Sequence, residues 1–122
     1  MNDVCIVSAI RTAVGSLGKS FKSVKAEELG SSVISGSMKK LSLKDKDIDE
    51  VIMGQVLTGG AGQNPARQAM IQAGIPKEKT AYIVNQVCGS GIRSIVSGFQ
   101  SIKYKTYVPC WNNNASPPHH IQ

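Results

Sequence analysis

The residues AYIVNQVCGSGIRSIV, numbers 81 to 96, predict a buried strand that turns directly into a helix. The segment Ala81–Val87 is rich in apolar and β-branched residues, which favours a strand. After the tight turn Cys88–Gly91, apolar residues recur at helical spacing from Ile92 to Ile102. A strand followed at once by an amphipathic helix is typical of folds with parallel strands.

Two earlier segments repeat the pattern. A short apolar run at residues 4–7 predicts a first strand, and the spacing of apolar residues over 26–40 predicts a helix ending in two lysines. Residues 51–56 predict a second strand, which a glycine-rich turn ends. Asn64 and Pro65 then suit the N-cap and first position of another helix. Three strand–helix pairs predict an α/β layered fold with a mainly parallel sheet.

The length, charge and cysteine content of the chain restrict the kinds of protein to which it can belong. A chain of 122 residues supports one hydrophobic core. The net charge of +6 is spread along the chain, which favours solvated lysines over a nucleic-acid surface. Three cysteines without a CxxC pair indicate neither a disulfide framework nor a metal site, and favour a reducing compartment such as the cytoplasm. We expect no signal peptide and, because no apolar run approaches about 18 residues, no contact with a membrane.

Cys88 is the candidate nucleophile. It lies where the predicted strand meets the predicted helix, and the positive end of a helix dipole stabilises thiolate over thiol. Gly89 and Gly91 allow a sharp turn and close approach of a substrate. Position alone leaves open whether Cys88 is reactive or a structural cysteine, because cysteine is often a core residue.

Four blocks in order resemble the N-terminal part of the thiolase family, especially its acetyl-CoA acetyltransferases: VCIVSAIRT (4–12) with Gly15 and Ser16, DEVIMG (49–54), GQNPARQA (62–69) and NQVCGSG (85–91). The resemblance implies that Cys88 attacks an acyl-CoA and forms an acyl-thioester enzyme, and that its backbone N–H helps to hold the oxyanion. It also implies CoA thioesters as substrates, no cofactor-binding or metal residues, and the homo-oligomers of the family. Residues 1–102 would form an incomplete first half-domain.

The resemblance stops after Ile102, and residues 103–122 predict an irregular tail. We expect a truncated product or a shifted reading frame. The family takes a histidine, a second cysteine and an asparagine from its C-terminal half, and binds CoA partly through a later loop domain. Cys110, His119 and His120 match none of its later motifs. We therefore expect no turnover by this chain alone.

Three other interpretations rest on parts of the sequence. The chain can be a non-catalytic fragment or interaction protein that keeps a thiolase-like half-fold. Gly18-Lys19-Ser20 is similar to the end of a P-loop, but Ala13 occupies the place of its first glycine. The alternating aspartates 45, 47 and 49 suggest the start of a calcium loop. Such a loop requires glycine where this chain has Glu50 and glutamate where it has Val56, so the sequence contradicts a calcium site.

Overall fold

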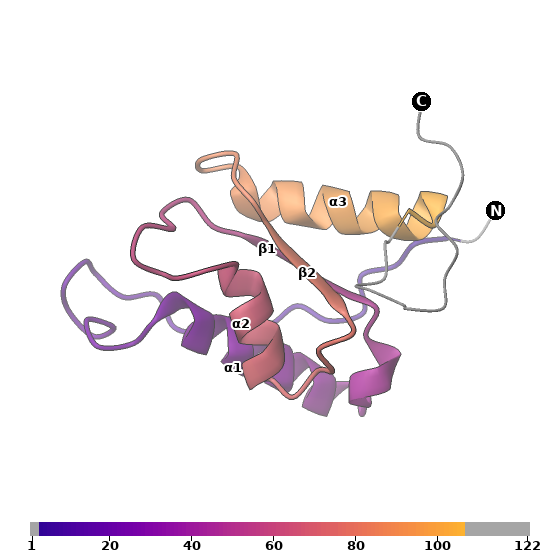
Figure 1. Ribbon diagram of the computed structural model, residues 1–122, viewed down its shortest axis with the longest axis horizontal. Coiled ribbons are helices and arrows are strands. Elements are labelled where there is room, and N and C mark those ends of the chain that lie inside the picture. Colours follow the sequence, from indigo (N-terminus) through magenta and orange to yellow (C-terminus); the bar gives the residue numbers. More distant parts are fainter. Residues whose placement is uncertain (1–2, 107–122) are drawn as a thin grey trace.

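The computed structural model describes residues 3–106, arranged as two strands between helices (Figure 1). Helices α1 and α2 cover one face of the sheet, and α3 crosses the other face. The elements in chain order are α1 Ala26–Lys40, the short 3-10 helix η1 Asp45–Asp47, β1 Glu50–Gly54, α2 Pro65–Gln72, β2 Thr80–Val84 and α3 Ser90–Tyr104. The predicted α/β class with a parallel sheet is confirmed.

The two strands pair in parallel, with Glu50 opposite Thr80 and Gly54 opposite Val84. A further hydrogen bond of 3.1 Å, from the Gln55 amide to the Val84 carbonyl, continues the ladder beyond β1. Parallel strands need a crossover between them, which α2 supplies. The carboxyl ends of both strands therefore lie at one edge of the sheet, where Cys88 follows β2.

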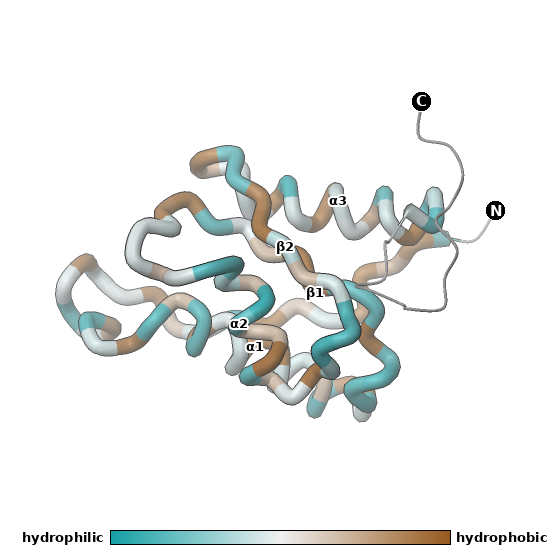
Figure 2. Tube along the Cα trace, in the orientation of Figure 1, coloured by the Kyte–Doolittle hydropathy of each residue, from teal (hydrophilic) through white to brown (hydrophobic). Residues whose placement is uncertain are grey.

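The hydrophobic core lies between the sheet and the pair α1 and α2. Met70 is fully buried there, and Val51 and Ala81 face it from the two strands. Gly30 of α1 lies so close to this core that an added Cβ would be 2.8 Å from the Met53 Cε. Figure 2 shows the apolar residues of the strands between the helices. The core is completed by small side chains, Ala66 and Ala69, and by Ile75.

Helix α2 begins where the sequence predicts. Asn64 adopts the left-handed conformation with φ of +44°, which asparagine tolerates better than most residues. Its side chain accepts a hydrogen bond of 3.1 Å from the Arg67 amide and donates one of 2.8 Å to the Ala81 carbonyl, so the helix cap also holds β2. Gly74, with φ of +86°, lies just past the helix end.

The predicted strand at residues 4–7 is wrong. The segment forms no strand, and Ile6 and Val7 are 77% and 69% exposed. An apolar run becomes a strand only if another strand satisfies its backbone groups, and among residues 3–106 β1 pairs with β2 alone. The apolar run at residues 4–7 does not by itself reveal whether another strand is available to pair with it.

Helix α3 confirms the third predicted helix and extends it by two residues at each end. Lys105 follows it in the left-handed conformation. Most of the predicted tail, 107–122, lies outside the described residues, so the boundary at residue 102 stays a prediction. No helix within residues 3–106 is long and apolar enough to cross a membrane.

Candidate active site

Cys88 lies in the short connection between β2 and α3, two positions before the first residue of α3. Its thiol is free and the residue is exposed. The connection leaves the sheet at the carboxyl ends of the parallel strands (Figure 1), which is where ligands bind in open α/β sheets. The position therefore leaves Sγ open to a substrate.

The backbone around Cys88 turns sharply. Val87 adopts φ of +48°, which is unusual for a β-branched side chain and costs of order 1–3 kcal/mol. Two hydrogen bonds close the turn: the Gly89 amide donates to the Gln86 carbonyl at 2.9 Å, and the Ser90 amide donates to the Val87 carbonyl at 3.1 Å. Strain of this kind persists where the surroundings enforce it, and it is concentrated at functional sites.

Two polar side chains enforce the turn. The buried Ser90 hydroxyl accepts from the Gln86 amide at 2.9 Å and donates to the Val87 carbonyl at 2.6 Å. The Asn85 side chain accepts from the Val87 amide at 3.0 Å and donates to the carbonyl of Val56, after β1, at 3.0 Å. Sequence reasoning assigned neither residue a role, although both lie inside the NQVCGSG block.

Helix α3 presents its N-terminus next to Cys88. Gly89 is the N-cap, and no side chain caps the helix. The Arg93 amide donates to the Gly89 carbonyl at 2.9 Å, so regular helical bonding starts immediately after the cysteine. The first amides of a helix carry a partial positive charge, which favours negative charge on a neighbouring atom. Cys88 therefore directly precedes the N-terminus of α3.

The structure brings no second cysteine or histidine to Cys88 within residues 3–106. Cys5 lies in the exposed N-terminal segment, and Cys110, His119 and His120 lie outside the described residues. No three histidine, cysteine, aspartate or glutamate residues of the described chain gather as a possible metal site. Cys88 is therefore the only one of the candidate groups that the described residues place at this edge.

The alternative sites fit their proposed ligands poorly. Gly18-Lys19-Ser20 lies in turns, and α1 starts only at Ala26, so this segment does not lie at a helix N-terminus as a P-loop does. The Asp45 carboxylate accepts a hydrogen bond from the Lys46 amide, and the Asp47 carboxylate accepts one from the Lys44 amide, each at 2.9 Å. Asp49 instead faces the Lys79 ammonium at 3.4 Å. These three aspartates thus do not converge.

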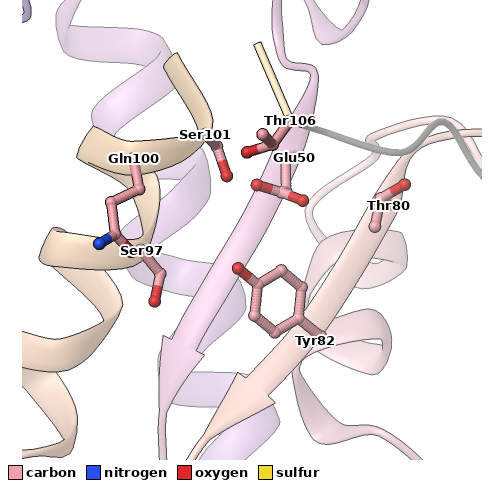
Figure 3. Close-up of a pocket in the computed structure, with 7 residues that line it drawn as sticks. All are labelled: Glu50, Thr80, Tyr82, Ser97, Gln100, Ser101 and Thr106. Atoms are coloured by element: carbon pink, nitrogen blue, oxygen red, sulfur yellow. The ribbon is translucent and has the colours of Figure 1, made fainter. Parts of the chain in front are cut away.

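A cavity of about 340 Å³, lined by residues with polar side chains, lies between the strands and α3 (Figure 3). Glu50 and Tyr82 face it from the sheet, and Ser101 faces it from α3. Glu50 and Thr80 begin the strands, so the cavity lies at the amino ends of β1 and β2, away from Cys88. Ligands of parallel sheets bind at the opposite edge. The remaining lining residues are Thr80, Ser97, Gln100 and Thr106.

Comparison with known proteins identifies the family of the chain. The family model "Thiolase, N-terminal domain" matches residues 4–108. Acetyl-CoA acetyltransferases of Cupriavidus necator and Rhizobium meliloti are each 50% identical to the chain, over 84% and 81% of its length. The acetyl-CoA acetyltransferase of Schizosaccharomyces pombe is 46% identical over 82%. The chain spans about a quarter of these curated relatives, 25–26% of their length. With most of its residues matched by the family model, the chain belongs to the thiolase family, of which it carries the N-terminal domain region.

Proposed function

We propose that this chain supplies the acyl-accepting nucleophile of an acetyl-CoA C-acetyltransferase, and that the nucleophile is Cys88. The observation that carries the proposal is the exposed thiol at the carboxyl edge of a parallel sheet, directly before the N-terminus of α3. The family match and the names of the relatives support the choice of an acyl-CoA as substrate.

The proposed step is an acyl transfer between two sulfur atoms. The Cys88 thiolate attacks the thioester carbonyl carbon, and the carbonyl oxygen takes the negative charge of the tetrahedral intermediate. The backbone N–H of Cys88 and the positive end of α3 stabilise that oxygen. The carbon–sulfur bond to CoA then breaks, and CoA leaves as a thiol with the proton that Cys88 gave up. The acyl group remains on Sγ.

The second half of the reaction needs groups beyond Cys88. Thiolysis delivers the acyl group to CoA, and Claisen condensation delivers it to the carbanion of a second acetyl-CoA. Each requires a base and a second acid–base group. The family resemblance assigns these roles to residues of the C-terminal half. We therefore propose that the 122-residue chain by itself is acylated once and does not turn over, because catalytic groups that act as a unit lose most of their effect when members are missing.

No cofactor is needed for this chemistry, because the covalent bond to Sγ carries the acyl group. We propose CoA thioesters as the only small-molecule partners, and a reducing, cytoplasmic setting that keeps the thiolate unoxidised. In the complete proteins of the family the subunits form homo-oligomers, and we extend that expectation to this chain in its full context.

The exposed apolar face of α3 favours a second candidate, a non-catalytic interaction role. Ile95 and Phe99, one helical turn apart, are 54% and 46% exposed. Apolar patches of this kind mark surfaces that other protein covers. The two candidates differ in one outcome, because only the first requires a reaction at Cys88.

Incubation of the purified chain with acetyl-CoA, followed by peptide mass spectrometry, tests the proposal. We expect one acetyl group on the peptide that contains Cys88, and none there in Cys88→Ser. Acetylation of Cys5 at an equal rate would show non-specific transfer and contradict the assignment. A thiolysis assay with acetoacetyl-CoA and CoA separates acylation from turnover. Sustained cleavage that is lost in Cys88→Ser would overturn the single-turnover part of the proposal.

A further inference from the structure

We infer that Gly54, at the end of β1, is a positioning residue for Cys88: the absence of a side chain there sets where α3 begins. The inference rests on the proposed function, since it matters to chemistry only if Cys88 is the nucleophile. Gly54 does not contact the thiol. It acts through the first peptide of α3.

The start of α3 lies directly on the backbone of Gly54. A Cβ at residue 54 would be 2.5 Å from the Ser90 carbonyl oxygen and 2.7 Å from the Gly91 amide nitrogen. These are backbone atoms, which cannot rotate away as a side chain does. Glycine in a strand often marks a place where another backbone approaches closely, and Gly54 is the last residue of β1. Any larger residue at position 54 must therefore move α3 or β1.

A shift of the Ser90–Gly91 peptide reaches Cys88 through hydrogen bonds. The Ser90 hydroxyl holds the Gln86 amide at 2.9 Å and the Val87 carbonyl at 2.6 Å, so it clamps the residues before the cysteine to the start of the helix. Asn85 holds the same turn from the other side by donating to the Val56 carbonyl at 3.0 Å. Cys88 thus lies in a turn that is held to the chain after β1 by Asn85, and whose other end packs closely against Gly54 through Ser90.

A larger side chain at residue 54 would act against the contact that Asn85 makes on the other side of the turn. Asn85 keeps the turn close to the chain that follows β1, whereas a Cβ at residue 54 pushes the helix start away from the same strand. The strained Val87 lies between them, with φ of +48°. We expect this turn to yield first, which changes the direction of Sγ relative to the first amides of α3. A displacement of about 1 Å at a reacting group can cost a factor of about 100 in rate.

The test compares iodoacetamide labelling of Cys88 with that of Cys5 in the same molecule, at several pH values. Cys5 lies in the exposed N-terminal segment and serves as an internal reference. The variant is Gly54→Ala. The matched control is Gly98→Ala within α3, whose Cβ would meet only the Ile52 Cδ1, at 4.0 Å. Urea unfolding of each variant reports stability separately.

We expect Cys88 of the unmodified chain to label faster than Cys5. Gly54→Ala should lower the ratio of the two rates by about two- to fivefold, the size of effect that a helix N-terminus has on a neighbouring charge. The ratio should fall at every pH tested while the labelling rate of Cys5 stays unchanged, a change that lower stability alone does not produce. Gly98→Ala should leave the ratio unchanged.

The outcomes separate the inference from the proposed function. Equal or slower labelling of Cys88 in the unmodified chain would contradict the nucleophile itself. If Cys88 labels faster than Cys5 in the unmodified chain, and the ratio of the two rates is the same in a folded Gly54→Ala variant, only the positioning role of Gly54 is overturned. If Gly54→Ala shows no cooperative unfolding, Ser90→Ala replaces it, because this change removes the clamp without adding an atom. A folded Ser90→Ala variant with the original ratio would likewise overturn the inference.

Discussion

The two faces of the sheet differ in how far the described residues complete them. On one face α1 and α2 enclose a core with Met70 fully buried at its centre. On the other face α3 crosses the strands but leaves Ile95 and Phe99 about half exposed. The closed face holds the molecule together, whereas the open face carries the start of α3 and the candidate nucleophile. The chain thus has its hydrophobic core on one side of the sheet and its candidate nucleophile at the margin of the other.

A core truncation tests the closed face. Met70→Ala should lower the free energy of unfolding by about 2–5 kcal/mol, because it removes a fully buried side chain and leaves a cavity. The neighbouring Ile71 provides a matched control, since it is 44% exposed on the same helix. Ile71→Ala should cost less than about 1 kcal/mol. Urea denaturation followed by circular dichroism measures both, and equal losses would show that the core is not closed.

The cap of α2 tests the link between helix and strand on the closed face. Asn64→Ala removes the bonds to the Arg67 amide and the Ala81 carbonyl and places alanine at a positive φ, so we expect a loss of about 1–2 kcal/mol. Asn64→Asp retains the acceptor for Arg67 and should lose less. If the aspartate variant is as unstable as the alanine variant, the bond to Ala81 and not the cap is the stabilising contact.

Polar substitutions on α3 test the open face. The double variant Ile95→Gln and Phe99→Gln should change the free energy of unfolding by only about 0.5–1 kcal/mol, because neither side chain is fully buried. We expect the unmodified chain to self-associate through this face, and the variant to be closer to monomeric. Analytical ultracentrifugation over a range of concentrations measures this. A variant that unfolds like Met70→Ala would show that α3 belongs to the core.

The closed face was the more predictable of the two from sequence. Asn64, Pro65 and Gly74 determine the limits of α2 through local backbone preferences, which neighbouring residues alone reveal. The parallel pairing followed from strand–helix alternation. The strand predicted at residues 4–7 failed because pairing depends on a distant segment, and a run of apolar residues predicts burial without identifying what covers it.

The candidate site was predictable only in its central residue. Cys88 could be found because its chemistry and its place before a helix are visible in the sequence. The positive φ of Val87 could not be predicted, since β-branched residues avoid that conformation. Gly54 lies 36 positions before Ser90, and only the packed structure shows that the two backbones touch. An isolated glycine inside the predicted strand 51–56 was the one available signal.

The position of the crossover β1–α2–β2 in the sequence determines which part of the chain can fold first during translation. All the elements of the closed face lie within residues 26–84, so they precede Cys88 in the chain. During translation these residues leave the ribosome first, and folding domains generally form in that order. We expect a nascent chain stalled soon after β2 emerges to resist proteolysis over residues 26–84 already. Cys88 would then leave the ribosome after the elements of the closed face have folded.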